Sequence, residues 1–288
     1  MVDGVRTRYL EAGAGPTLVL LHSGEFGGCA ELSWEYLVGP LSEHFRVIAP
    51  DWLGYGGTDK IHDFGGKRAR MLTHLRRFLQ VMSIDKADFM GNSMGATWLT
   101  QEAAAEPPGL PVRRMVVLSG AGYVPDNEHR RMTLDYDGSP EAMRGLLQAI
   151  FHHSIWWDDP AYVERRNALA TAPGAWESVA AARFKSPLVP ARSTHGQPDT
   201  THYESILAPT LLIAGQEDKL REPGYASELA ARIKDCRLVE IPNCGHCPNI
   251  EHPDTVLAEV LPFLLESDHV IETPDDRSSR IDRGSELR

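Results

Sequence analysis

The sequence predicts an α/β fold: a mostly parallel sheet with helices on both faces and an inserted helical cap. Three observations predict it. Short apolar runs alternate with amphipathic segments along most of the chain. The apolar runs are nearly continuous, as strands that are covered on both faces must be. One long interval, residues 123–205, contains no convincing strand and is rich in aromatic residues.

Six short apolar segments are expected to be strands. They cover residues 17–22, 45–49, 87–91, 115–119, 210–214 and 237–241. Helix patterns lie between them, and this alternation predicts parallel pairing through crossover helices.

The helices of the core are recognised by their periodicity. Met71, Leu75 and Phe78 recur at helical spacing within residues 67–83, so one stripe of that helix should be buried. Further helices are expected directly after Met94 and over residues 224–234 and 254–264.

The segments divide into a core and a cap. The predicted core consists of residues 1–122 and 206–266, and the predicted cap of residues 123–205. Within the cap, residues 139–151 and 160–170 each have a proline near the first turn, which favours a helix start. Residues 267–288 are polar, charged and without pattern, and we expect a mobile tail.

Composition narrows the class of partner. The 288 residues are 42% apolar and 24% charged, which is typical of globular proteins. A net charge of −11 disfavours nucleic acids and anionic membranes, so we expect a small-molecule substrate. The opening "MVDGVRTRYLEAG" lacks the pattern of a signal peptide and favours a strand hairpin. We expect a cytoplasmic protein, with a homodimer as an open alternative to a monomer.

The stretch "FMGNSMGAT" carries the strongest chemical signal. A strand that ends at Gly91 runs through G-x-S-x-G into a helix, which is the context of a nucleophile elbow. Side chains at Gly91 and Gly95 would collide with neighbouring backbone. We therefore predict Ser93 as a nucleophile, with the backbone N–H of Met94 as one oxyanion donor. The alternative is a simple glycine-flanked serine turn.

A serine hydroxyl needs a base, and the base needs an orienting acid. In "TLLIAGQED" a strand ends at Ala214 and Asp218 lies just past its tip, with Glu217 as the alternative acid. In "RLVEIPNCGHC" a strand leads into a loop that carries His246. All three groups follow strands at one sheet edge, so they should converge.

Cys244 and Cys247 flank His246 and allow two other interpretations, a redox dithiol and a metal site. A redox dithiol belongs at an early helix start within a small fold. A zinc site needs more ligands, and no second C-x-x-C exists. We therefore predict a histidine base, no metal and no cofactor. Cys247 is expected to line the site, the four cysteines to be reduced, and His252 to be a surface or helix-cap residue.

The second oxyanion donor should come from "LLHSGEFGG". The N–H of Gly24 is expected to join that of Met94, and His22 to brace the loop. In "PDWLGYGGTD", the residues that we expect to be architectural are Asp51, Gly54 and Gly56.

Five motifs occur in order over residues 1–265: His-x-Gly, "DWLGYGGTD", "GNSMG", "GQED" and "CGHCPNIEHP". Together they resemble the α/β-hydrolase superfamily with a helical cap. Within it the chain is most similar to the meta-cleavage-product hydrolases, which cut carbon–carbon bonds in vinylogous diketo acids, and to their esterase relatives. Two departures stand out. "SGEFGG" follows His22 where that family has a run of glycines, and Cys247 stands where it has a tryptophan.

The resemblance implies the α/β-hydrolase fold and a set of substrate-binding residues. Asn92 belongs to the form of the elbow that the family favours. The cap stretch "YVERRNALATAPG" resembles the family segment whose arginine binds the substrate carboxylate, with Arg166 as the match and Arg165 as the alternative. A solvated Arg166 on the cap helix is also open. Trp156 is expected to contribute an aromatic floor, or else to pack within the cap with its neighbours His152, His153 and Trp157.

These features predict a serine-type hydrolase that attacks an activated carbonyl of a small organic substrate. Carbon–carbon hydrolysis of a keto acid is one expected reaction, and hydrolysis of a carboxylic ester or lactone is the alternative. A lyase on the same fold and a ligand receptor also remain open.

Overall fold

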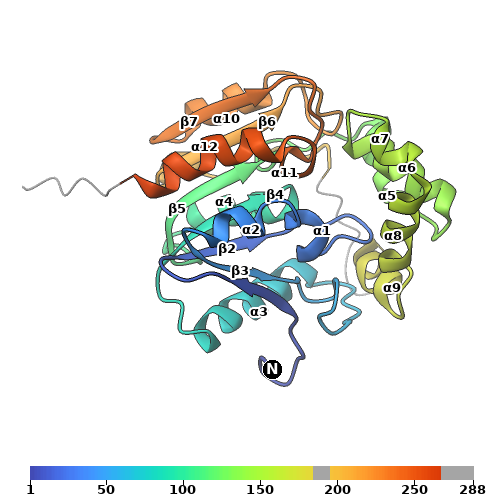
Figure 1. The fold of residues 1–288 in the computed structure, drawn as a ribbon, viewed down its shortest axis with the longest axis horizontal. Helices are drawn as coiled ribbons and strands as arrows, with labels where there is room; N and C mark the ends of the chain where they lie inside the picture. The colour runs from blue at the N-terminus through green and yellow to red at the C-terminus, as the bar shows by residue number, and fades with distance from the viewer. Residues whose placement is uncertain (184–194, 267–288) are drawn as a thin grey trace, which may run out of the picture.

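The computed structural model describes residues 1–183 and 195–266, and it centres on a seven-stranded sheet (Figure 1). The strand order is β1-β3-β2-β4-β5-β6-β7. The strands are β1 (Tyr9–Ala12), β2 (Thr17–Leu21), β3 (Arg46–Pro50), β4 (Ala87–Asn92), β5 (Val112–Leu118), β6 (Thr210–Gly215) and β7 (Cys236–Ile241). β1 runs antiparallel to β3, and every other neighbouring pair is parallel. The α/β-hydrolase fold is therefore confirmed.

The six expected strands are β2 to β7, and two details differ from expectation. The predicted hairpin at the start of the chain is reduced to one antiparallel bridge between Val2 and Val5, while β1 pairs with β3. β5 also begins three residues before the expected Met115, at Val112. Arg113 lies in this extension and donates from Nε to Asp88 of β4 at 2.8 Å. This polar pair between neighbouring strands stabilises the additional residues of β5.

Helices cover both faces of the sheet because strand side chains alternate between two buried clusters. Leu18 and Leu20 lie in one cluster, and Val19 and Leu21 lie in the other. The first face packs against α1 (Ala30–Trp34), α2 (Val38–Ser42) and α12 (Pro253–Leu265). The second face packs against α3 (Lys67–Val81), α4 (Met94–Ala103) and α10 (Tyr225–Arg232). The short helix α11 (Pro248–Glu251) precedes α12.

Further helices lie between β5 and β6 in the chain and group together beside the sheet, on the right in Figure 1. They are α5 (Glu128–Leu134), α6 (Pro140–Ile150), α7 (Ile155–Asp158), α8 (Pro160–Ala170) and α9 (Ala175–Ala180). α6 and α8 are the two expected cap helices. Ser139 and Asp159 cap their first turns, each accepting a backbone N–H.

Two further expectations concerned the division into core and cap and the end of the chain. The division into core and cap at residues 123–205 stays a prediction, and the expected tail at 267–288 lies outside the described residues. Among the helices of the described ranges, none is long and apolar enough to cross a membrane.

The two glycines of the elbow leave no room for a side chain. A Cβ on Gly95 would lie 2.2 Å from the backbone oxygen of Leu21, and one on Gly91 would lie 2.6 Å from the backbone nitrogen of Ala96. Backbone at these positions cannot move aside. We expect Gly95→Ala to lower the free energy of unfolding by about 1–3 kcal/mol, measured by urea denaturation.

Gly39 provides the matched control for that substitution. It lies on α2, is exposed, and has no atom within 4 Å of the added Cβ. Gly39→Ala should leave stability unchanged or slightly higher, because alanine favours helix. Equal effects at Gly95 and Gly39 would contradict the steric account of the elbow.

Candidate active site

Ser93 occupies the sharp turn between β4 and α4. Its backbone has φ 53° and ψ −112°, a conformation that side-chain-bearing residues rarely adopt. The turn is held from both sides, since Ser93 N donates to Leu118 O at 2.9 Å and Ser93 O accepts from Thr97 N at 2.8 Å. Such strain at a serine between strand and helix is typical of a nucleophile elbow.

Three side chains that are distant in sequence meet at this turn. The Oγ of Ser93 lies 2.7 Å from Nε2 of His246, and Nδ1 of His246 lies 2.7 Å from Oδ2 of Asp218. Each residue follows the carboxyl end of a strand, namely β4, β6 or β7. The structure therefore brings the expected nucleophile, base and acid into one hydrogen-bonded chain.

Asp218 is buried but remains suited to hold a charge. Burial alone would raise its pKa, but the charge of His246 and the hydrogen bond to it outweigh that effect, and the pKa is lowered. Its other carboxylate oxygen accepts from Leu220 N at 2.9 Å. The ionised carboxylate accepts the Nδ1–H of His246, which leaves Nε2 free to accept from Ser93.

The loop that carries His246 is fixed by neighbouring backbone and side-chain groups. His246 N donates to Ile150 O at the end of α6 over 2.7 Å. Asn92 Nδ2 donates to His246 O at 3.2 Å and to Leu118 O at 3.3 Å. Asn92 is fully buried, so it supports this loop and does not line the cavity.

Two glutamates hold the backbone of the same loop. Oε2 of Glu217 accepts from Cys244 N at 2.9 Å, so the alternative acid serves the loop while Asp218 contacts the ring. Glu251 was not expected from the sequence. It accepts from Gly245 N through Oε1 and from His152 N through Oε2, both at 2.8 Å. The position of Glu251 within "NIEHP", shortly after the histidine, is the sequence feature that could have indicated this role.

The expected oxyanion donors are neighbours. A Cβ on Gly24 would lie only 2.5 Å from Sδ of Met94, so the two residues touch. Met94 begins α4, where the first N–H groups have no partner within the helix. His22 braces the loop as expected, because its buried ring contacts Ser23 O at 2.6 Å and accepts from Trp52 N at 3.0 Å.

Asp51 has the architectural contacts that the sequence indicated. The carboxylate is buried and accepts from the backbone N–H groups of Ala30 and Gly57, each at 2.8 Å. It also pairs with Arg8 at 3.2 Å. These contacts tie the loop after β3 to α1 and away from the serine.

Ser93 and His246 open into a cavity of about 670 Å³, a volume typical of small-molecule sites. Helices α3 and α4 and helices α5, α6 and α9 all contribute to its lining. Its described lining residues are Gly24, Glu25, Tyr55, Lys67, Arg68, Ser93, Met94, Thr97, Trp98, Val124, Arg130, Thr133, Leu134, Ile150, Val179, Arg183, His195, Leu220, Arg221, His246 and Cys247.

Cys247 lines this cavity as expected, whereas Trp156 does not. The Trp156 ring packs 5.1 Å from both Phe151 and Tyr162, measured between ring centroids. His152 and His153 also pack on each other at 4.8 Å. Of the two interpretations of Trp156, the geometry therefore supports packing within the cap.

Arg166 is fully buried, so the interpretation as a solvated arginine is wrong. Its Nη1 lies 3.0 Å from Oε1 of Glu25, and its guanidinium sits over the rings of Phe151 and Tyr162. Arg166 is not among the lining residues of the cavity, whereas Glu25 is. The alternative, Arg165, is partly exposed and pairs with Glu35 at 2.8 Å. The expected carboxylate-binding arginine is thus paired with a carboxylate of its own chain.

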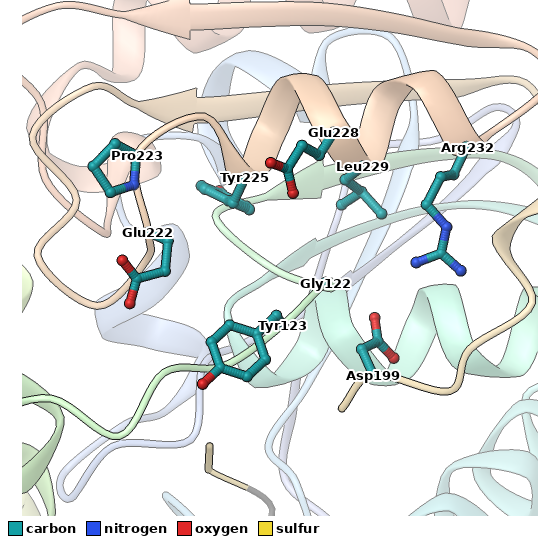
Figure 2. A pocket seen from close by; sticks show the side chains of 9 residues that line it. All are labelled: Gly122, Tyr123, Asp199, Glu222, Pro223, Tyr225, Glu228, Leu229 and Arg232. Carbon is teal, nitrogen blue, oxygen red and sulfur yellow. The ribbon is translucent and has the colours of Figure 1, made fainter. Parts of the chain in front are cut away.

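A second, smaller cavity of about 430 Å³ lies beside α10 (Figure 2). Figure 2 shows the carboxylates of Asp199, Glu222 and Glu228 around it, with Arg232 at one side. Its described lining includes no serine, cysteine or histidine. The chemistry for nucleophilic catalysis therefore lies in the larger cavity.

The cysteine pair has the character of buried thiols. Within the described ranges the four cysteines are free, and Cys244 and Cys247 are almost fully buried. Burial raises the pKa of both thiols. Since the thiolate is the reactive form, both should be inert. No group of three His, Cys, Asp or Glu side chains in the described part of the chain is arranged to hold a metal ion.

The raised pKa values of the Cys244 and Cys247 thiols lead to a direct prediction. Dithiothreitol or iodoacetamide, applied to the native protein at neutral pH, should leave ester hydrolysis unchanged, because little thiolate is present. Activity is followed beside the alkylated mass of each cysteine peptide. Loss of activity in step with alkylation of Cys247 would contradict the assignment.

The chain is similar in sequence and in fold to known hydrolases. A model described as "Alpha/beta hydrolase family" matches residues 18–260. The chain is 32% identical to a 2-hydroxy-6-oxo-6-(2'-aminophenyl)hexa-2,4-dienoic acid hydrolase of Metapseudomonas resinovorans, over 91% of this chain and 88% of that protein. It is 31% identical to a 2-hydroxymuconate semialdehyde hydrolase of Pseudomonas sp. (strain CF600), over 92% of each. A solved meta-cleavage product hydrolase from Pseudomonas fluorescens superposes with a TM-score of 0.81 at 27% identity, covering 91% of this chain and 94% of that one.

Proposed function

Because the chain belongs to the alpha/beta hydrolase family, we propose that it is a serine hydrolase in which Ser93 is the nucleophile. His246 is the general base, and Asp218 orients the imidazole. One observation carries the proposal: two hydrogen bonds of 2.7 Å join Asp218 to His246 and His246 to Ser93. This is the geometry that activates a hydroxyl at neutral pH.

In the first half of the reaction Ser93 Oγ attacks the substrate carbonyl while Nε2 of His246 takes its proton. Asp218 stabilises the imidazolium that forms. The developing oxyanion is held by the backbone N–H groups of Met94 and Gly24. Donors placed in advance act without reorganisation, so they favour the transition state over the bound substrate.

In the second half water cleaves the acyl-serine, with His246 again as the base. The nature of the leaving group decides which substrates react. An ester releases an oxygen that His246 protonates. A carbon–carbon bond releases a carbanion, so the leaving fragment needs a keto group that delocalises the electron pair until a proton arrives.

The proposed substrate class is a vinylogous diketo acid. The relatives support it, since they are named as hydrolases of a 2-hydroxy-6-oxo-dienoic acid and of 2-hydroxymuconate semialdehyde. A neutral ester or lactone is the second candidate, favoured by the pairing of Arg166 with Glu25. A cytoplasmic location and a homodimer remain predictions.

One preparation assayed on three substrates tests the proposal. We expect the highest kcat/KM on a vinylogous diketo acid, with lower values on an aryl ester and a lactone. Preference for the ester or lactone with no diketo acid cleavage would make the chain an ester hydrolase. Turnover too slow to be catalytic on all three would favour a receptor, and cleavage without an acyl-serine would favour a lyase.

A further inference from the structure

The charge of the larger cavity is opposite to that of the chain. The sequence has 40 acidic and 29 Lys and Arg residues. The described lining of the cavity instead includes five cations, Lys67, Arg68, Arg130, Arg183 and Arg221, against the carboxylate of Glu25. That carboxylate is paired with Arg166. A cleft lined by one sign of charge concentrates ligands of the other sign.

Two of these cations already interact with other groups of the protein. Arg68 lies 3.5 Å from a carboxylate oxygen of Glu102. Arg221 is buried and donates to the backbone oxygens of Ser119 and Ala121. Arg130 and Arg183 each donate through one Nη group to a backbone oxygen, whereas Arg221 uses both of its Nη groups. No carboxylate of the described residues lies within ion-pair distance of Lys67, Arg130 or Arg183.

Lys67 begins α3 and is half-buried. Its ammonium donates to two neutral acceptors, Tyr55 OH at 3.3 Å and Val179 O at 3.2 Å. Burial, and then the charge of Arg183, lower its pKa to about 8. Tyr55 OH in turn donates to Gly24 O at 3.0 Å, so Lys67 is two hydrogen bonds from the loop beside Ser93.

The other two cations adjoin Lys67 on the cap side. Val179, which accepts from Lys67, lies four residues before Arg183. Arg183 donates from Nη1 to Leu134 O at 2.5 Å, and Leu134 lies one helical turn after Arg130 on α5. The Nε of Arg130 is buried without an acceptor. All three side chains line the same cavity, and they come from different segments of the chain.

We propose that Lys67, Arg130 and Arg183 form an anion subsite that binds a carboxylate of the substrate remote from the bond broken at Ser93. The inference rests on the proposed hydrolysis. The guanidinium groups offer paired N–H donors and the ammonium a point charge, a combination suited to a carboxylate. Arg166 is not assigned to this subsite, because it does not line the cavity and its Nη1 is paired with Glu25. The substrates are therefore acyl or diketo compounds with an acidic end.

A matched pair of esters tests the subsite. The mono-4-nitrophenyl esters of succinic, glutaric and adipic acid carry the carboxylate, and their methyl-capped forms do not. For the preferred chain length, Lys67→Met and Arg183→Met should each lower kcat/KM on the acid by about tenfold or more, mostly through KM. The capped ester should change by less than about threefold, and Lys67→Arg should restore most of the loss on the acid.

Arg77→Met is the control, because Arg77 is partly exposed on the same helix and pairs with exposed Asp3, away from the cavity. Equal losses on acid and capped esters would show that Lys67 and Arg183 only hold the cap in place, and would overturn the subsite. So would unchanged kinetics at all three lengths.

A binding measurement separates the subsite from the proposed function. Glutarate titrated calorimetrically into the Ser93→Ala protein should bind, and adding Lys67→Met should weaken that binding by about tenfold. If neither ester turns over but glutarate still binds through Lys67, the hydrolase proposal fails and the subsite stands. If glutarate binds equally with and without Lys67, the subsite fails whatever the turnover.

Discussion

Ser93→Ala should lower kcat/KM by roughly 10³–10⁶-fold on every substrate that the protein hydrolyses, while its thermal unfolding midpoint stays within a few degrees. The hydroxyl faces the cavity and donates only to His246, so its removal opens no hole in the core. Without it His246 has no group to activate. Steady-state kinetics and a thermal melt on the same preparation measure both effects.

A half-buried serine that does not line the cavity provides the control for this substitution. Ser205 lies in the short 3₁₀ segment Tyr203–Ser205, and its hydroxyl donates to exposed Glu106 at 3.5 Å, so Ser205→Ala should keep full activity. A Ser93→Ala protein that retained more than about a tenth of wild-type activity would remove Ser93 from the mechanism.

Arg166→Met should destabilise the protein by about 3–5 kcal/mol in urea denaturation. Glu25 is the reason. Its side chain is only 9% exposed, and although burial acts to raise its pKa, the charge of Arg166 keeps that pKa below its usual value. Without Arg166, the carboxylate is left charged and unpaired in a buried place, or must take up a proton.

The double variant Glu25→Gln with Arg166→Met separates this cause from lost packing. It should recover most of the stability, because no unpaired charge remains. Arg165→Met is the control on the same helix. Arg165 is partly exposed and pairs with Glu35, so its loss should cost less than about 1 kcal/mol. A double variant no more stable than Arg166→Met alone would show that the cost lies in packing.

The parts of the site that follow strand ends were predictable from the sequence. Ser93, Asp218 and His246 each lie in a short motif directly after an apolar run, and parallel strands bring their carboxyl ends to one edge. The need for glycines in the elbow was also predictable, because a tight turn between a strand and a helix leaves no space for side chains beside the nucleophile. Local patterns of this kind predict fold and chemistry together.

Contacts between distant segments were not predictable in this way. Arg166 and Glu25 are 141 residues apart, and no periodicity links a cap helix to the loop after β2. The resemblance to a family suggested a substrate contact for Arg166, but no local pattern in the sequence indicated that Glu25 lies beside it. The proposed anion subsite was not predictable for the same reason, since Lys67, Arg130 and Arg183 come from separate segments of the chain.

The central claim is that His246 activates Ser93 as the nucleophile, and labelling with a fluorophosphonate tests it most directly. The reagent forms a bond only with an activated serine, and peptide mass spectrometry locates it while residual activity is followed. The account predicts one equivalent of label on Ser93, loss of activity in proportion to label, and no labelling in His246→Gln. Label on any other residue, or full activity after Ser93 is completely labelled, would contradict it.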